Sequence, residues 1–140
     1  MNTIEKLLNL TIEKKMKGVY LSDKRVLTLG AGNRPKNFTG EYKQWHSNGQ
    51  LYLHYNYKSG NKHGERKEWY DNGKVFIHCY YKNGKKHGEY KSWWSTGQLN
   101  VYRYFKNGEL HGEYKEWDYN GNLTFHYFYK NYKIVKDYLE

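Results

Sequence analysis

The feature that most constrains this chain is an internal repeat of 24 residues, which starts at Gly40 and runs through four units without a gap. The units are GEYKQWHSNGQLYLHYNYKSGNKH, GERKEWYDNGKVFIHCYYKNGKKH, GEYKSWWSTGQLNVYRYFKNGELH and GEYKEWDYNGNLTFHYFYKNYKIV. A fixed period of this length indicates stacked copies of one small structural unit. Each copy needs its neighbours in order to bury a face.

Six positions of the unit hold the same residue in all four copies. They are Gly40/Gly64/Gly88/Gly112, Glu41/Glu65/Glu89/Glu113, Lys43/Lys67/Lys91/Lys115, Trp45/Trp69/Trp93/Trp117, Gly49/Gly73/Gly97/Gly121 and Lys58/Lys82/Lys106/Lys130. A third glycine column, Gly60/Gly84/Gly108, is broken by Tyr132 in the last unit. Glycine at fixed intervals predicts turns at fixed intervals.

Each unit predicts one β-hairpin. The first strand is Glu41–Trp45, the turn Ser47-Asn48-Gly49 follows, and the second strand is Leu51–Lys58, after which Ser59-Gly60 turns the chain back. Asn-Gly favours the positive backbone angles of tight hairpin turns, and aromatic and β-branched residues favour strands. Period-two alternation places one apolar set on a single face. Its members are Leu51, Leu53, Tyr55 and Tyr57 in the first unit and Val75, Ile77, Cys79 and Tyr81 in the second.

Composition separates a leader from the repeats. Of the 27 aromatic residues, 25 lie after Gly40, whereas residues 1–39 hold eight Lys/Arg against three Asp/Glu, a net charge of +5 in a short segment. A basic surface of this kind favours anionic partners. The candidate residues for an anionic ligand are Lys14, Lys15, Lys17, Lys24, Arg25, Arg34 and Lys36.

The leader predicts a short helix over Asn2–Lys17, because its apolar residues recur at three- and four-residue spacing. The expected role is a cap over the open edge of the first repeat, and a docking or membrane-surface helix is the alternative. Val19–Leu21 and Val26–Leu29 are candidates for a degenerate hairpin. The loop Gly30–Pro35 lacks the Gly-Lys-Ser/Thr ending of a phosphate-binding loop, so nucleotide binding is not predicted.

The segment KNGKKHGEY (Lys82–Tyr90) resembles the centre of the MORN motif, a glycine turn followed by a His-Gly step, and SGNKHGER and NGELHGEY repeat it. The resemblance covers Gly40 to about Tyr132 and is to a divergent variant, because Tyr42, Arg66, Tyr90 and Tyr114 replace the usual second glycine. Similar variants occur in many bacterial proteins, some described as antitoxins, and in giant-virus proteins. The resemblance implies an all-β fold, namely an elongated single-layer twisted antiparallel sheet of stacked hairpins, here with a short N-terminal helix.

The repeated polar residues do not predict an active site. His63/His87/His111 and His54/His78/His126 form two columns, but equivalent places in adjacent hairpins are about 9–10 Å apart. Zinc ligands must each lie about 2 Å from one ion, so turn-packing histidines are expected. Cys79 is the single cysteine, which excludes an intramolecular disulfide and fits a reducing compartment. We therefore predict a non-enzyme with no catalytic residue, cofactor or metal.

Two sets of aromatic residues are the candidates for partner contact. One is the tryptophan column, Trp45, Trp69, Trp93 and Trp117; the other, of opposite parity to the main apolar set, is Tyr52, Phe76, Tyr80, Tyr104 and Phe128. A two-residue hairpin loop would place Lys43 opposite His54 and the tryptophans on the more polar face, where a partner could reach them. A three-residue loop would place Trp45 opposite Leu51, in the core. The sequence leaves both alternatives open.

The predicted organisation is a basic leader with helix and degenerate hairpin cap at 1–39, four repeats at 40–136 and a C-terminal tail at 137–140. The predicted function is a non-enzymatic scaffold for protein–protein interaction, with a protein partner or a second copy in a homodimer. The alternative is binding of an acidic phospholipid surface or nucleic acid. The first sixteen residues lack a secretion signal and a membrane span, so a cytoplasmic location is expected, in a host cell or virion if the protein is viral.

Overall fold

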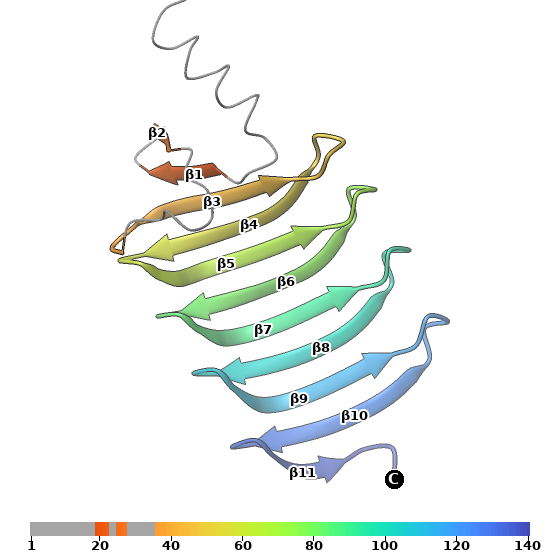
Figure 1. Cartoon of the computed structure of the whole chain (residues 1–140). Coiled ribbons are helices and arrows are strands. Elements are labelled where there is room, and N and C mark those ends of the chain that lie inside the picture. Colours follow the sequence, from red (N-terminus) through yellow and green to blue (C-terminus); the bar gives the residue numbers. More distant parts are fainter. Residues whose placement is uncertain (1–18, 23–24, 28–35) are drawn as a thin grey trace, which may run out of the picture.

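The computed structural model describes residues 19–22, 25–27 and 36–140, which form one antiparallel sheet in a single twisted layer (Figure 1). Its eleven strands follow the order β11-β10-β9-β8-β7-β6-β5-β4-β3-β1-β2. They are β1 (Val19–Ser22), β2 (Arg25–Leu27), β3 (Gly40–Trp45), β4 (Leu51–Lys58), β5 (Asn61–Trp69), β6 (Val75–Lys82), β7 (Lys85–Trp93), β8 (Leu99–Lys106), β9 (Glu109–Trp117), β10 (Leu123–Lys130) and β11 (Lys133–Asp137). The all-β hairpin architecture is confirmed, and the helix predicted at Asn2–Lys17 lies outside the described residues.

The strands cross the boundaries of the sequence units. The predicted second strand, Leu51–Lys58, agrees with β4. The first strand of each later hairpin is longer than the repeat columns indicated, because β5, β7 and β9 each have nine residues and continue through the His-Gly step. Each structural hairpin therefore begins before the glycine that opens its sequence unit.

The turns between β4 and β5 and at the equivalent places are tight two-residue turns. Ser59 and Gly60 both have positive φ angles, of 48° and 81°. Asn83-Gly84 and Asn107-Gly108 repeat the pattern. Two successive positive φ angles define the type I′ turn, whose twist matches that of the flanking strands. This explains why each of these turns holds either Ser-Gly or Asn-Gly.

The turns at the opposite ends of the strands enclose three residues. The Gly49 N–H donates to the His46 carbonyl at 2.9 Å, and the His46 N–H donates to the Gln50 carbonyl at 2.8 Å. Gly49 has a φ of 84°, whereas Asn48 is not among the residues with positive φ. The three-residue alternative for Ser47-Asn48-Gly49 is therefore confirmed, and this Asn-Gly pair does not form a turn with two positive angles.

The pairing of β3 with β4 nevertheless contains both predicted registers. Lys43 lies opposite His54, as a two-residue loop would require, and Trp45 lies opposite Leu51, as a three-residue loop would require. A bulge beside Trp45 absorbs the one-residue difference. The later units repeat the arrangement with Trp69 opposite Val75, Trp93 opposite Leu99 and Trp117 opposite Leu123.

A second bulge lies at the His-Gly step and explains the invariant glycine of each unit. Tyr55 pairs with Arg66 and Tyr57 with Lys62, so four residue steps on β5 oppose two on β4. Gly64, within this bulge, has a φ of 82°, and the Asn56 side-chain amide donates to the Glu65 carbonyl at 3.1 Å. A residue with a side chain would be strained at this φ angle.

The core lies on one face of the sheet, in two rows that cross the strands. We call this the core face. The first row is Tyr42, Tyr55, Arg66, Cys79, Tyr90, Arg103, Tyr114 and Tyr127, and the second is Gln44, Leu53, Glu68, Ile77, Ser92, Val101, Glu116 and Phe125, each member paired with the next. Leu53, Ile77 and Val101 are buried, and Cys79 is 1% exposed. Neighbours along the rows supply this burial in a one-layer sheet.

The hairpin of β1 and β2 joins the sheet with its two strands in the opposite order from the strands of a repeat hairpin. β1 pairs with both β2 and β3, so the earlier strand of this hairpin lies against the repeats. In the repeats it is the later strand of each hairpin that meets the next unit. The two strands fall close to the segments predicted for a degenerate hairpin, but their order is not that of a repeat unit.

Tyr132→Gly is expected to stabilise the protein. Tyr132 has a φ of 64° at the place where three earlier units have glycine, and this conformation costs a residue with a side chain about 1–2 kcal/mol. Glycine recovers part of that cost, less about 0.5–1 kcal/mol of chain entropy, so a gain of about 0.5 kcal/mol should appear in urea unfolding. Gly108→Tyr makes the reverse change in the third unit and should destabilise the protein. A neutral Gly108→Tyr would contradict the assigned turn geometry.

Candidate interaction surfaces

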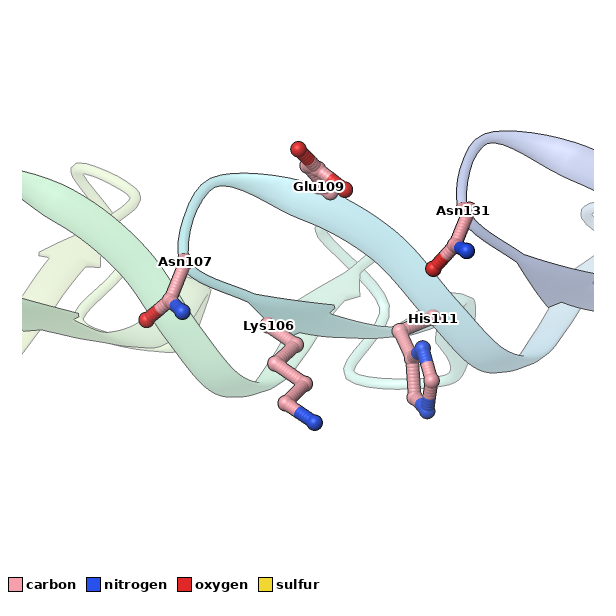
Figure 2. Close-up of a pocket in the computed structure, with 5 residues that line it drawn as sticks. All are labelled: Lys106, Asn107, Glu109, His111 and Asn131. Atoms are coloured by element: carbon pink, nitrogen blue, oxygen red, sulfur yellow. The ribbon is translucent and has the colours of Figure 1, made fainter.

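The edge of the sheet between the third and fourth units forms a shallow pocket of about 170 Å³, lined by Lys106, Asn107, Glu109, His111 and Asn131. Figure 2 shows Glu109 of β9 projecting away from the side to which Lys106 of β8 and His111 of β9 project. These side chains do not converge on a common point, so the pocket does not assemble a set of reacting groups.

The histidines of the His-Gly step lie along the same edge of the sheet. His87 Nδ1 accepts the Asn107 backbone N–H at 3.3 Å, so this side chain binds a turn amide. Within residues 19–22, 25–27 and 36–140, no group of three or more His, Cys, Asp or Glu has the arrangement of a metal site. A structural role in the turns accounts for the contact seen at His87.

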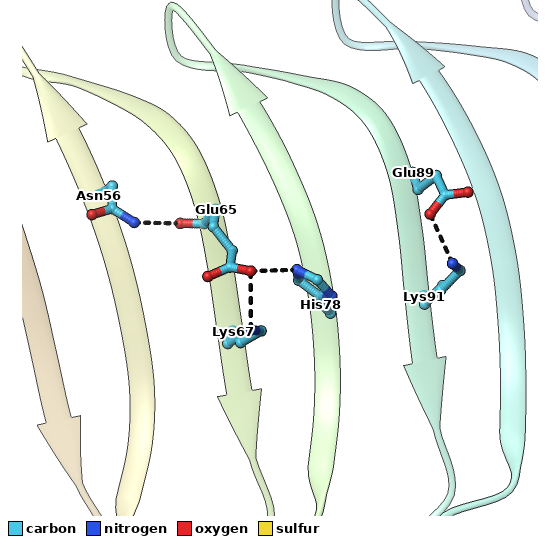
Figure 3. A network of polar contacts seen from close by, with 6 residues as sticks. All are labelled: Asn56, Glu65, Lys67, His78, Glu89 and Lys91. Atoms are coloured by element: carbon cyan, nitrogen blue, oxygen red, sulfur yellow. Dashed lines mark hydrogen bonds and ion pairs between the residues drawn. The ribbon is translucent and has the colours of Figure 1, made fainter.

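The face opposite the core carries a lattice of charged side chains, which we call the lattice face. One row across the strands is Lys43, His54, Lys67, His78, Lys91, Tyr102, Lys115 and His126, each paired with the next. The glutamates Glu41, Glu65, Glu89 and Glu113 lie two residues before the lysines on the same strands. Figure 3 shows Glu65 between Lys67 and His78.

Every glutamate of the lattice is paired with its lysine. The Nζ–carboxylate distances are 2.6 Å for Lys43–Glu41, 3.0 Å for Lys67–Glu65, 2.7 Å for Lys91–Glu89 and 2.9 Å for Lys115–Glu113. Each pair joins two residues on the same face of one strand. Because these side chains are partly exposed, each pair contributes about 0–1 kcal/mol.

The second histidine column completes the lattice. His78 Nε2 lies 2.8 Å from Glu65 Oε1, and His126 Nε2 lies 3.3 Å from Glu113 Oε1. In the third unit the Tyr102 hydroxyl takes this place and donates to Glu89 at 3.3 Å. Sequence spacing placed these histidines too far apart for a shared metal, and the structure shows instead that each one reaches the glutamate of its own hairpin.

The lattice holds its carboxylates in the charged form. The hydrogen bond from Lys43 lowers the pKa of Glu41, and that from Lys67 lowers the pKa of Glu65. The lysines of the third and fourth units have the same effect on the pKa values of Glu89 and Glu113. Such carboxylates fix the positions of their neighbours and are poor proton donors near neutral pH.

Stability is expected to fall in acid because of these pairs. A carboxylate with a lowered pKa stabilises the fold above its unfolded value, here about 4.5, and this contribution is lost as the pH falls through the folded pKa. Urea unfolding measured from pH 6 down to about pH 3 should show this decline. Glu65→Gln should flatten the slope, whereas Asp71→Asn, at an exposed turn, should leave it unchanged. An equal slope in wild type and Glu65→Gln would exclude the lattice as its source.

Three tyrosines stand out from the lattice face. Tyr52, Tyr80 and Tyr104 are 38%, 39% and 37% exposed, and Tyr80 and Tyr104 lie directly opposite Glu65 and Glu89. Phe76 and Phe128, the other two residues of this predicted set, are half-buried. Trp45, Trp69, Trp93 and Trp117 are also half-buried, at the strand ends beside the three-residue loops. The tryptophans are therefore neither fully in the core nor fully exposed to a partner, which were the two alternatives that the sequence left open.

The basic leader is largely outside the described residues. Of its seven candidate residues, only Lys36 has a described side chain, which is exposed, and Arg25 is described as the first residue of β2. Lys14, Lys15, Lys17, Lys24 and Arg34 are not described. In the part of the chain that the structure describes, no helix is long and apolar enough to span a membrane.

Sequence reasoning missed a group of cations on the core face. The Arg66 guanidinium lies 5.2 Å from the Tyr55 ring centroid, 3.8 Å from Cys79 Sγ, and forms an ion pair with Glu68. Arg103 lies 4.8 Å from the Tyr114 ring centroid and 3.2 Å from Glu116. The only signal in the sequence is that each arginine stands in a column otherwise occupied mainly by tyrosine.

Two lysines extend this group along the same face. Lys62 Nζ lies 4.2 Å from the Tyr55 ring centroid and 5.4 Å from that of Tyr81. Lys86 Nζ lies 4.9 Å from the Tyr90 ring centroid and 5.0 Å from that of Phe105. Cation–π contacts of this kind contribute about 0.5–2 kcal/mol, more where water is excluded. The aromatic rings thus hold these cations at fixed places.

An open antiparallel sheet of tandem hairpins, with ordered side-chain rows on both faces, defines a repeat protein of the solenoid class. A scan against protein-family models matches the MORN repeat variant at residues 38–59, 62–83, 86–107 and 110–131. The chain belongs to this MORN repeat family, as the His-Gly steps indicated. MORN repeats are non-enzymatic modules that generally serve as scaffolds or interaction surfaces. Searches of curated proteins and of solved structures found no match.

Proposed function

We propose that this protein is a scaffold that binds a protein partner through its lattice face, with Tyr52, Tyr80 and Tyr104 as the principal contacts. The observation that carries the proposal is the exposure of these three rings among charges whose positions are fixed by pairing. Tyrosine supplies a large contact area with few rotatable bonds, and exposed tyrosines are frequent energetic centres of protein interfaces.

The paired charges support a role in specificity. Each lysine of the lattice row is bonded to a glutamate, so the surface presents alternating signs and not a continuous positive stripe. A partner must match this pattern to avoid like-charge contacts. The same pairing disfavours the alternative that the lysine columns bind phospholipid or nucleic acid, because their charge is already neutralised.

The tryptophan column belongs to the same proposal. Half-buried tryptophans at one end of the strands can pack against the sheet and still offer an edge to a partner. A second copy of the chain is the alternative occupant of this face, and a homodimer would bury the same tyrosines. Light scattering across a dilution series separates a monomer from a dimer.

The test is affinity capture from the native cell with wild type and two variants. Tyr80→Ala with Tyr104→Ala is expected to lower the yield of the captured partner at least tenfold, because truncation of each central contact costs about 1–2 kcal/mol. Tyr119→Ala is the control, since Tyr119 is more exposed but lies in a turn. Equal capture by the double variant and the control would rule out the lattice face as the contact surface.

A further inference from the structure

Lys62 and Lys86 differ from the lattice lysines and from Arg66 and Arg103 in their ion pairing. Among residues 19–22, 25–27 and 36–140, neither ammonium has a carboxylate within ion-pair distance, whereas the lattice lysines and both core-face arginines do. Both side chains are half-buried, and burial lowers the pKa of Lys86. A half-buried cation without an anion is costly, and an arriving carboxylate would relieve that cost.

The charge of this region is one-sided. Lys62, Arg66, Lys86 and Arg103 supply four positive charges, and Glu68 and Glu116 supply two negative ones, which leaves a net charge of +2 (four minus two). The excess belongs to the two lysines, which stand on either side of Tyr81: Lys62 lies over its ring, and Lys86 is its partner across the strands.

We propose that the core face holds a second binding site, in which Lys62 and Lys86 bind two carboxylates of an acidic polypeptide segment that crosses β5, β6 and β7. This site is independent of the lattice face, which lies on the other side of the sheet. Charge complementarity selects the occupant, because a segment with two carboxylates neutralises the excess of +2.

The spacing of the lysines defines the segment further. Lys62 on β5 and Lys86 on β7 occupy equivalent places in adjacent units, two strand steps or about 9–10 Å apart. In the polyproline II conformation every third side chain points the same way, with a rise of about 3.1 Å per residue or about 9 Å per turn. Carboxylates three residues apart in such a segment match the two ammoniums.

Two other occupants fit the face less well. Single-stranded nucleic acid binds by stacking its bases on open rings, but Lys62 and Arg66 lie over Tyr55, and Lys86 lies over Tyr90 and Phe105. A second copy of this chain would bring the same excess of positive charge against the site. The experiment below distinguishes nucleic acid and a second copy of the chain from an acidic peptide.

The experiment measures fluorescence anisotropy of two labelled peptides titrated with the full chain. One peptide has glutamate at every third position with proline between, and the other has the same composition with its glutamates adjacent. We expect saturable binding of the first peptide and at least tenfold weaker binding of the second. Lys62→Gln with Lys86→Gln should weaken the first interaction at least tenfold, because each substitution removes a charge-assisted contact.

Matched variants control for charge and folding. Lys82→Gln with Lys85→Gln removes the same charge from an adjacent exposed turn and should leave peptide binding unchanged. Lys62→Arg with Lys86→Arg keeps the charge and should retain binding, which separates a lost contact from a lost fold. Equal loss in both Gln variants would show a non-specific charge effect and overturn the site.

Three further outcomes would also overturn it. They are the absence of binding by either peptide, tighter binding of an oligothymidine that the Lys62/Lys86 variant abolishes, and a dimer that this variant dissociates. Each leaves the capture test of the tyrosines on the lattice face unaffected, so failure of this site is distinguishable from failure of the proposed scaffold function.

Discussion

Gly60→Ala is expected to destabilise the protein by about 3 kcal/mol, one of the two largest effects anticipated here. A Cβ atom at this position would lie 1.8 Å from the Lys36 carbonyl oxygen, and the backbone has a φ of +81°. The steric conflict costs about 1–3 kcal/mol and the positive φ about 1–2 kcal/mol. Moving the segment away would also weaken the hydrogen bond from the Gly60 N–H to the Phe38 carbonyl, at 2.8 Å. Urea unfolding followed by tryptophan fluorescence measures the loss.

Gly49→Ala is the matched control for this prediction. Gly49 has nearly the same φ, +84°, but an added Cβ would meet no atom of the described residues within 4 Å. Its expected cost is the backbone term alone, about 1–2 kcal/mol. The difference between the two variants measures how tightly the segment at Lys36–Phe38 packs on the first type I′ turn. Equal losses would show that this contact does not form in solution.

Arg66→Tyr is expected to cost about 3 kcal/mol, although tyrosine is the residue that the other three units place in this column. Glu68 is 7% exposed, and Arg66 is its ion-pair partner. Removing the arginine leaves a buried carboxylate without its cation, and an unpaired buried charge carries a large desolvation cost. Urea unfolding at pH 7 should show a lower midpoint with a similar slope.

The repeat itself supplies the rescue of this variant. The third unit holds Tyr90 and Ser92 where the second holds Arg66 and Glu68, and Ser92 is also buried. Arg66→Tyr combined with Glu68→Ser is therefore expected to lie within about 1 kcal/mol of wild type, because both charges leave together. A double variant as unstable as the single one would mean that the arginine acts through packing and not through its pair with Glu68.

Much of the fold could be predicted from the sequence because each repeat unit carries the same turn residues and the same alternation of side chains. Ser59-Gly60, Asn83-Gly84 and Asn107-Gly108 predicted tight turns, and the structure places positive φ angles at each of them. Period-two alternation placed Leu53 and Ile77 on the buried face, and both are buried. Local turn chemistry and side-chain alternation are short-range properties, so they can be read directly from neighbouring residues.

The register near the tryptophans could not be predicted in the same way. The sequence offered two alternatives for Trp45, and a bulge lets both pairings coexist within one hairpin. A bulge sets an extra residue of one strand against its partner strand, so it is recognised only once the pairing of both strands is known. The His-Gly step posed the same difficulty, since its glycine columns marked the places without revealing that the strand continues through them.

The cations of the core face were the least predictable feature. Alternation assigns Arg103 to the face of the main apolar set, and the register of β5 with its neighbours assigns Arg66 to the same face, where arginine is rare unless it is paired. Their partners come from elsewhere along the rows: Glu68 is two residues away, whereas Cys79, Tyr90 and Glu116 lie on neighbouring strands. Such contacts become visible only once the register is known, and Lys62 and Lys86 stand out for the same reason.

The most direct test of the account is a set of NMR distance restraints on the full chain. One open layer of hairpins predicts cross-strand contacts from the backbone of Tyr90 to Cys79 and Arg103, its neighbours in the first row, and none between the side chains of the first and fourth units. Contacts that join those two units would mean a closed or two-layered structure. Helical contacts after Gly40 would likewise contradict the account.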